Sequence, residues 1–370
     1  MSSALYGPDG FFVSGPGPAA HFRTSVHASP VFASCLLRLL SSLDGALGQP
    51  ARLDVVDVGA GRGELLRSLS LAVGVSGEPT RSGRSGLIPP RAGSPETLTT
   101  TAAAGVSPPT EPATLGSSPA APVPLAQRVR LVAVEKAPRP EDLPPEIEWV
   151  DEIPQGITGL LVATEWLDNV PLDLAVDTPE GWRYLLVDPA TGEESTGDPV
   201  TPEDADWLKQ WWPSPAPASA EIGRSRDEAW ADAVGRLDRG LALGVDYGHL
   251  RDHRPVAGSL TGYRGGRQVA PVPDGSCDVT AHVAMDSVAS AGERVARCAY
   301  TLVSQREGLR ALGADGGRPP LSMASRDPAG YLRALAAASA VAELTDPAGL
   351  GGHWWLLQPV GVTVDPLMAR

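Results

Sequence analysis

Short apolar runs alternate with longer, mixed stretches along most of the chain. Six runs rich in Val, Leu and Ala predict buried strands, at Leu53–Val58, Val129–Glu135, Ile157–Thr164, Leu241–Tyr247, Ala299–Val303 and Trp354–Val360. The stretches between them predict helices at about Ser29–Leu43, Glu64–Val73, Asp227–Leu237, Met285–Ala291 and Ala329–Leu344. Near-continuous apolar strands separated by helices are typical of an α/β fold with a doubly wound, mostly parallel sheet.

Two inserts interrupt this alternation. From Val75 to Gln127 the chain is rich in Pro, Ser and Gly and has no aromatic residue. Such a segment cannot bury enough apolar surface to offset its ordering entropy, so we expect 75–127 to be disordered. Within 172–220, "LDLAVDTPEGWRYLLVD" predicts a hairpin that turns at Pro179–Gly181, and an irregular polar excursion is expected after it. The expected organisation is an N-terminal segment, 1–50, that covers the cleft of one large domain, 51–370.

Composition and charge narrow the class of protein. The 370 residues carry a net charge of −14, with a pI of about 4.9, which disfavours general binding to nucleic acid or to an anionic membrane. Three cysteines without metal-ligand spacing indicate a reducing compartment and no metal site. With no signal peptide and no membrane-length apolar run, the sequence predicts a cytoplasmic protein. It leaves the oligomeric state open.

A glycine-rich turn, "VVDVGAGRGEL", follows the first predicted strand. A nucleotide-binding P-loop needs Gly-Lys-Ser/Thr at its end, and this turn lacks the Lys and the hydroxyl residue. The dinucleotide fingerprint would place its third glycine at Glu64, where a carboxylate would face a pyrophosphate at a helix N-terminus. Neither a P-loop nor a dinucleotide site therefore fits.

The remaining pattern is an acid followed by three alternating glycines: Asp57, Gly59, Gly61 and Gly63. It suits S-adenosylmethionine, whose methionine end carries an ammonium and a carboxylate but no pyrophosphate. Asp57 can accept from the ammonium, and the backbone N–H groups of the turn can meet the carboxylate. The alternative interpretation is a tight turn between a strand and a helix, with no ligand.

An acidic residue at the end of the next strand supports the cofactor. Ligands with a free ribose are bound by an acid about 20 residues after the glycine turn. Glu135 lies 76 residues after Gly59, but without the 53-residue insert the separation is 23. Glu135 is therefore expected to bind the ribose hydroxyls.

Two carboxylates follow the third predicted strand, in "LLVATEWLDNVP". In a doubly wound sheet this strand lies next to the cofactor cleft, so Glu165 and Asp168 are expected to line it. Together they can clamp a guanidinium, or one can take a proton from an attacking nucleophile. Surface acids that cap the next element are the alternative, and Trp166 fits a cleft wall as well as the core.

Further candidates come from "GVDYGH" and "DVTAHV". Asp246 ends a predicted strand at the same edge of the sheet, and His282 lies in the second motif. Either could assist with protons. A lone histidine is more often a structural hydrogen-bonding residue, so both interpretations of His282, structural and catalytic, stay open.

Taken together, these motifs resemble the MidA family of S-adenosylmethionine-dependent methyltransferases, over nearly the whole chain outside the insert. "LYGPDGFF" and "HFRTSVHASPVF" precede the glycine turn, and "TEWLDNVP", "DYG", "GSLTGY" and "DVTAHV" follow in the family's order. The family's acidic strand end, followed by a Trp, appears as Glu135 and Trp149. The resemblance implies a seven-stranded, Rossmann-like class I methyltransferase sheet.

The resemblance also implies a substrate. In the best-known family activity, an arginine of a respiratory-complex subunit becomes symmetrically dimethylated, so a protein arginine is the expected acceptor. Asp151, at the end of the strand after Glu135, is expected to reach the adenine amine. Departures from the family pattern fall at Thr164, His21, His27 and Ala284, in segments expected to approach the cleft, and they put the family's substrate in doubt.

Two rival functions remain, the first of them motivated by the departures at Thr164, His21 and His27. One is a cofactor-binding assembly factor without turnover. The other is a small-molecule O- or N-methyltransferase, with the Trp-rich Asp206–Trp212 stretch as a specificity wall. The segment Tyr6–Thr24 is either a mobile lid over the cofactor or, because of its Gly-Pro-Gly-Pro run, a fixed extended loop.

Overall fold

The computed structural model describes residues 1–14, 24–28, 30–75, 123–189, 192–213 and 219–363. Apart from Val123, these residues belong to one compact unit formed by Met1–Ser76 and Pro124–Arg370. The low-complexity stretch 76–122, and with it most of the predicted insert, lies outside the described residues. Leu125–Gln127, at the end of that insert, forms the short 3₁₀ helix η2.

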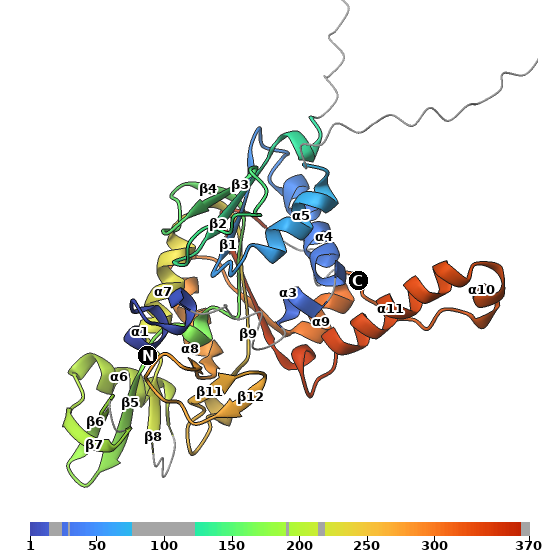
Figure 1. Cartoon of the computed structure of the whole chain (residues 1–370). Coiled ribbons are helices and arrows are strands. Elements are labelled where there is room, and N and C mark those ends of the chain that lie inside the picture. Colours follow the sequence, from blue (N-terminus) through green and yellow to red (C-terminus); the bar gives the residue numbers. More distant parts are fainter. Residues whose placement is uncertain (15–23, 29, 76–122, 190–191, 214–218, 364–370) are drawn as a thin grey trace, which may run out of the picture. The chain divides into compact units, whose positions relative to one another are not determined.

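A seven-stranded sheet forms the centre of the unit, in the order β15-β16-β9-β4-β1-β2-β3 (Figure 1). All neighbouring strands are parallel except β16, which runs antiparallel to both β9 and β15. The strands are β1 (Leu53–Val58), β2 (Val129–Val134), β3 (Ile147–Val150), β4 (Ile157–Thr164), β9 (Leu237–Asp246), β15 (Thr301–Ser304) and β16 (Trp354–Val360). This confirms the mostly parallel, seven-stranded α/β fold expected from the sequence.

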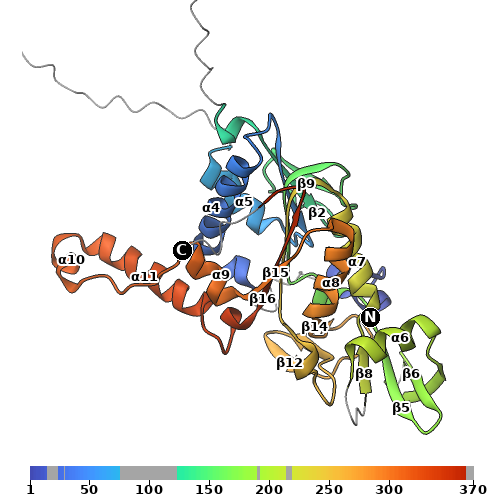
Figure 2. The same cartoon turned by 180° about the vertical axis from the view of Figure 1, so that it is seen from behind.

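Helices cover both faces of this sheet (Figures 1 and 2). Because successive side chains of a strand point to opposite faces, Val55 packs into one core and Val56 into the other. The first core contains side chains of α4 (Pro30–Ala46), α5 (Glu64–Val73), α9 (Gln305–Ala311) and α11 (Pro328–Leu344). The second contains those of α7 (Arg224–Gly235) and α8 (Met285–Ala296). Burial on both faces explains the continuous apolar runs of the sequence.

The predicted strands differ from the observed ones chiefly in two places. β9 begins at Leu237, where a helix was expected to end, because residues 237–240 continue the pairing with β4. The short strand β3 was absent from the six apolar runs, because Glu148 is exposed and only Ile147 is fully buried. An edge strand of four residues leaves too weak an alternation to be recognised.

The region 172–220 is more ordered than expected. The predicted hairpin is present as β5 (Asp173–Thr178) and β6 (Gly181–Val187). The stretch after it, expected to be irregular, forms β7 (Glu194–Pro199) and α6 (Pro202–Trp211), and β8 (Ser219–Ile222) completes a four-stranded sheet in the order β7-β6-β5-β8. The missed signal is "TPED", since Thr201 caps α6 and a proline follows it.

Smaller elements surround the carboxyl edge of the central sheet. α1 (Ser2–Tyr6), α2 (Phe11–Ser14) and α3 (Ser25–Ala28) precede α4. A three-stranded sheet consists of β12 (Arg267–Val269), β11 (Thr261–Arg264) and β13 (Asp278–Thr280), and a two-stranded one of β10 (Gly248–His249) and β14 (Val283–Ala284). The remaining elements are η3 (Leu167–Asn169), η4 (Arg251–His253), η5 (Leu350–Gly352) and α10 (Leu321–Arg326). No helix among the described residues is long and apolar enough to cross a membrane.

Candidate functional site

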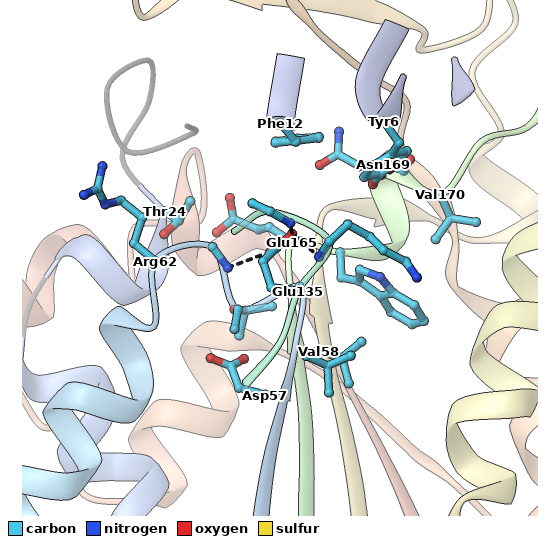
Figure 3. Close-up of a pocket in the computed structure, with 18 of the residues that line it drawn as sticks. Tyr6, Phe12, Thr24, Asp57, Val58, Arg62, Glu135, Glu165, Asn169 and Val170 are labelled. Carbon is cyan, nitrogen blue, oxygen red and sulfur yellow. Dashed lines mark hydrogen bonds between the residues drawn. The ribbon is translucent and has the colours of Figure 1, made fainter. Parts of the chain in front are cut away.

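A cavity of about 980 Å³ lies at the carboxyl ends of β1, β2 and β4 (Figure 3). β2 and β4 lie on either side of β1, and the chain passes from one side to the other between β3 and β4. This is the switch point at which open α/β sheets bind ligands. The turn after β1, the end of β2 and the segment after β4 all contribute lining residues, so the fold gathers the motifs predicted from the sequence.

The glycine turn after β1 has a left-handed backbone at each of its three glycines. The φ angles are 71° at Gly59, 58° at Gly61 and 78° at Gly63, a region that disfavours residues with a Cβ atom. Gly63 N–H donates to Ala60 O at 2.8 Å, and α5 begins at the next residue. The three glycines are therefore required by the backbone of the turn itself.

The turn is fixed to β2 through hydrogen bonds. The N–H groups of Gly59 and Ala60 donate to Val134 O, at 3.0 and 3.2 Å. Gly61 N–H donates to Glu135 Oε2 at 2.9 Å. Glu135 Oε1 also accepts from the N–H groups of Lys136 and Ala137, at 2.7 and 3.1 Å. Glu135 lines the cavity as expected, and its carboxylate already holds the turn in place; ribose binding stays a prediction.

Two glycines also allow side chains to pack closely on the turn. A Cβ atom at Gly59 would lie 3.0 Å from Trp166 Cδ1, and one at Gly63 would lie 2.7 Å from Leu143 Cδ1. Trp166 lines the cavity and also packs against the second core. Trp166 therefore serves both as a cavity wall and in core packing, the two roles that the sequence left open.

Gly63→Ala is expected to lower the melting temperature more than Gly74→Ala. Both glycines adopt a left-handed backbone, but a Cβ atom at Gly74 would meet nothing within 4 Å, so that variant carries only the conformational cost of about 1–2 kcal/mol. Gly63→Ala adds the contact with Leu143. Thermal unfolding of both variants measures the difference, and equal losses would show that Leu143 moves away without cost.

Asp57 is the last residue but one of β1, and it lines the cavity with a buried side chain, 2% exposed. Its Oδ1 atom is buried and has no hydrogen-bond partner among the described residues. Burial raises the pKa of the Asp57 carboxyl well above its usual value, and the charges of Glu64 and Glu135 raise it further. A cationic ligand in the cavity would relieve all three effects.

Glu165 follows β4 in an unusual backbone conformation. Its φ is 51°, a left-handed value that is uncommon for a residue other than glycine and often marks a functional site. Its N–H donates to Val245 O at 2.7 Å, and its Oε1 accepts from the N–H of Ser25 in α3 at 3.1 Å. Burial raises the pKa of the Glu165 carboxyl to about 8. The side chain lines the same cavity as Asp57.

Asp168 lies in η3, and one of its two oxygens is fully occupied. Oδ2 accepts from the Tyr247 hydroxyl and from Thr280 Oγ1, the latter at 2.6 Å. Oδ1 is buried and has no partner among the described residues. Burial raises the pKa of the Asp168 carboxyl, against the effect of the hydrogen bonds from Thr280 and Tyr247. Asp168 lines the cavity with Glu165, as the sequence predicted.

The structure does not bring the other two catalytic candidates to the cavity. Both oxygens of Asp246 accept from backbone N–H groups, of Leu167 and Asp168 (3.0 and 3.2 Å) and of Tyr247 (3.0 Å). Asp246 thus holds η3 in place through the N–H groups of its first two residues. His282 is exposed, and its ring packs edge-on against Tyr247 with centroids 5.2 Å apart. Neither residue lines the cavity. Their contacts support the segments around Asp168, and a role in proton transfer stays a prediction.

A buried arginine that the sequence analysis missed holds this region together. Arg226 of α7 is 1% exposed, and its guanidinium donates to four backbone carbonyls. Three of them are those of Val170 (3.0 Å), Ala281 (3.0 Å) and His282 (3.1 Å), and the fourth is that of Asp168. These bonds tie the segment after β4 to the "DVTAHV" motif. A single arginine in a helix gives no sequence signal of this role.

Residues of the N-terminal segment also line the cavity. They are Ser2, Tyr6, Phe12, Val13, Thr24 and Val26. Tyr6 OH donates to Asn169 O at 3.4 Å, and Ser25 holds Glu165 as described. These side chains therefore form part of the cavity wall. The cover expected of 1–50 stays a prediction, and residues 15–23 of the proposed lid lie outside the described residues.

The remaining predicted residues divide into two groups. Asp151 and Thr164 line the cavity, so the expected adenine contact and the departure at Thr164 both concern this site. Ala284 is buried in β14 and does not line it. His21 and the side chain of His27 lie outside the described part of the structure. No group of metal-ligating side chains occurs among the described residues.

Comparison with known proteins points to one class of enzyme. Residues 120–302 match the model of a family described as "Putative S-adenosyl-L-methionine-dependent methyltransferase". The matched range includes Glu135, Glu165 and Asp168, and begins after the glycine turn. A search of curated proteins gives no match.

Two solved structures from Burkholderia thailandensis share the fold. One is a superfamily member and "likely methyl transferase" bound to S-adenosyl-homocysteine; it is 22% identical, has a TM-score of 0.72, and the alignment covers 100% of this chain and 89% of that one. The other, a native structure of the same superfamily, is 22% identical with a TM-score of 0.69, and the coverage is 100% and 88%. The expected cofactor agrees with both the family description and the ligand of the first structure.

Proposed function

We propose that this protein is an S-adenosylmethionine-dependent methyltransferase that methylates a guanidinium nitrogen of a protein arginine. The observation that carries the proposal is the position of Glu165 and Asp168. Both line the cavity that contains Asp57 and the glycine turn, and neither side chain forms an ion pair within the described residues. Both acids lie in "TEWLDNVP". This segment resembles a signature of the MidA family, and the resemblance supports an arginine acceptor.

The residues at the end of β1 fit the cofactor. Asp57 Oδ1 is a buried acceptor without a partner among the described residues, as an ammonium group requires, and the glycine turn lines the same cavity. Glu135 follows β2 and Asp151 follows β3, and both line the cavity. In this proposal Glu135 binds the ribose and Asp151 the adenine. When bound, the cofactor supplies a methyl group on a positively charged sulfur.

The two acids fit a cationic acceptor better than a neutral one. Burial raises the pKa of both carboxyls. The charge of Arg226 lowers the pKa of Asp168 in part, but neither side chain is paired with a positive charge among the described residues. A guanidinium placed between them would provide this charge and donate paired hydrogen bonds. The volume of about 980 Å³ is at the upper end for ligand pockets, which leaves room for an acceptor beside the cofactor.

Methylation of a guanidinium releases one proton, and the cavity offers an atom to receive it. Asp168 Oδ1 has no donor among the described residues, whereas Oδ2 accepts two hydroxyl groups. In this proposal Glu165 orients the guanidinium, and Asp168 Oδ1 both orients it and takes the proton. Holding the nitrogen in line with the methyl group contributes most of the rate, as in other reactions that depend on proximity.

Acceptor binding is expected to strengthen as the pH rises toward 8. Burial raises the pKa of the Glu165 carboxyl to about 8, so this group is neutral at lower pH and offers a guanidinium no charge. The KM for an arginine peptide should therefore fall between about pH 6.5 and about pH 8.5, by up to about tenfold per unit below the pKa. Steady-state kinetics measure this, with Glu165→Gln as the variant expected to lose the dependence. A KM that stays constant would contradict the assignment.

The test of the proposed function is methyl transfer from labelled S-adenosylmethionine to short arginine peptides. Peptides with lysine in place of arginine are the matched acceptors, and mass spectrometry locates the methyl group. Transfer to arginine alone supports the proposal. Transfer to lysine or to small molecules would replace the acceptor but keep the enzyme class, and cofactor binding without any transfer would favour an assembly factor.

A further inference from the structure

The glycine turn offers no free backbone donor to the carboxylate end of the proposed cofactor. Besides the four N–H groups of residues 59, 60, 61 and 63 described above, the N–H of Arg62 donates to Glu64 Oε2 at 3.0 Å. All five N–H groups of the turn are therefore bonded within the protein. A ligand carboxylate that used them would have to displace bonds that hold the turn to β2 and α5.

The acidic residues around the cavity disfavour binding of this carboxylate. The lining includes six acidic side chains, of Asp57, Glu64, Glu135, Asp151, Glu165 and Asp168. An anionic group that enters such a cavity needs a positive partner. Only two lysine or arginine residues are among the lining residues that the structure describes, Arg62 and Lys136, and Lys136 Nζ donates to Asp151 O at 2.9 Å.

Arg62 is placed to be that partner. It is the residue between Gly61 and Gly63 in the turn, its side chain is exposed, and it lines the cavity. In Figure 3 its side chain extends outward from the turn, at the edge of the residues drawn and away from Asp57. The Arg62 side chain forms no hydrogen bond or ion pair in the part of the chain that is described. Its planar guanidinium matches a carboxylate through two parallel hydrogen bonds.

We propose that Arg62 binds the α-carboxylate of S-adenosylmethionine while Asp57 binds the ammonium of the same methionine moiety. The inference rests on the proposed function, because it assigns one end of that cofactor. It revises the expectation that backbone N–H groups of the turn bind the carboxylate. It also makes Arg62 a specificity residue, which selects cofactors with an intact amino-acid end.

The experiment combines protein variants with cofactor analogues in calorimetric titrations. The ligands are S-adenosylhomocysteine, decarboxylated S-adenosylmethionine and 5′-methylthioadenosine, of which only the first carries the carboxylate. The variants are Arg62→Ala, Arg62→Lys and Arg67→Ala. Arg67 is the matched control, because it lies in α5, pairs with Asp142 at 2.9 Å and does not line the cavity.

Arg62→Ala should weaken binding of S-adenosylhomocysteine by about tenfold or more, as the loss of a charge-assisted hydrogen bond implies. It should change the affinity for the two analogues without a carboxylate by less than about threefold, within the usual scatter of such contacts. Arg62→Lys should recover part of the loss, and Arg67→Ala should behave like the wild type.

Equal loss for all three ligands, or no loss for S-adenosylhomocysteine, would overturn the role of Arg62 and leave the methyltransferase proposal standing. Failure of the folded wild type to bind S-adenosylhomocysteine would instead overturn the proposed function, and this inference with it.

Discussion

Asp57→Ala is expected to weaken S-adenosylmethionine binding by several hundredfold or more. Asp57 Oδ1 is the buried acceptor for the ammonium, and leaving a buried charge without its partner costs about 3–5 kcal/mol. The same substitution should leave the melting temperature unchanged or higher. Burial raises the pKa of this carboxyl, so its ionised form destabilises the protein when no ligand is bound. Calorimetric titration and thermal unfolding measure the two effects.

The control for Asp57 is an acid of the same type outside the cavity. Asp142 is exposed and pairs with Arg67, so Asp142→Ala should retain wild-type cofactor affinity. Asp57→Asn keeps the shape of the side chain and should fail to bind as Asp57→Ala does. Wild-type affinity in a folded Asp57→Asn protein would show that the charge of Asp57 is not what the cofactor requires.

Glu165→Gln and Asp168→Asn are expected to lower kcat/KM for an arginine peptide by roughly 30- to 1,000-fold, or about 2–4 kcal/mol. A glutamine at 165 can still accept from the Ser25 N–H, so the loop should keep its conformation while the charge is lost. An asparagine at 168 satisfies the Tyr247 and Thr280 donors with its carbonyl and turns its NH₂ toward the cavity. Because an NH₂ group repels a guanidinium donor, we expect Asp168→Asn to have the larger effect.

Cofactor affinity distinguishes a specific loss of acceptor binding from disruption of the whole site. Neither variant should change S-adenosylhomocysteine binding more than about twofold, since both acids are assigned to the acceptor. Glu152→Gln is the matched control, because Glu152 is exposed and does not line the cavity. Near-wild-type transfer by Glu165→Gln would refute the guanidinium clamp, while a parallel loss of cofactor binding would move these residues to the cofactor site.

Much of the central fold was predictable because its signals are local. β1, β4, α5 and β16 have the bounds that the sequence predicts, since a buried parallel strand must be apolar along its whole length and a helix leaves a different spacing. The errors lie where burial is partial. β3 is an edge strand, and α6 packs with residues of β5 and β8 into a small separate core around Trp207 and Trp212, which hydrophobic pattern alone does not indicate.

The site was predictable where candidate acids follow strands that neighbour one another in the sheet. Asp57, Glu135, Glu165 and Asp168 line one cavity, because the carboxyl ends of β1, β2 and β4 meet at the switch point of the sheet. The same reasoning placed Asp246 there too, since β9 ends at the same edge. Its failure has a tertiary cause: η3 folds over the end of β9, and Asp246 binds the N–H groups of that helix.

The sequence by itself determined the strands and helices of the sheet, the need for three glycines after β1, and the acids at the strand ends. These follow from local rules of backbone geometry and burial, which neighbouring residues carry. Only the tertiary structure decided which oxygens are left without donors. Asp168 Oδ1 lacks a partner among the described residues because Tyr247 and Thr280 meet the other oxygen, and Glu165 is held by Ser25, 140 residues earlier. Such contacts depend on where distant elements pack, and no local pattern records that.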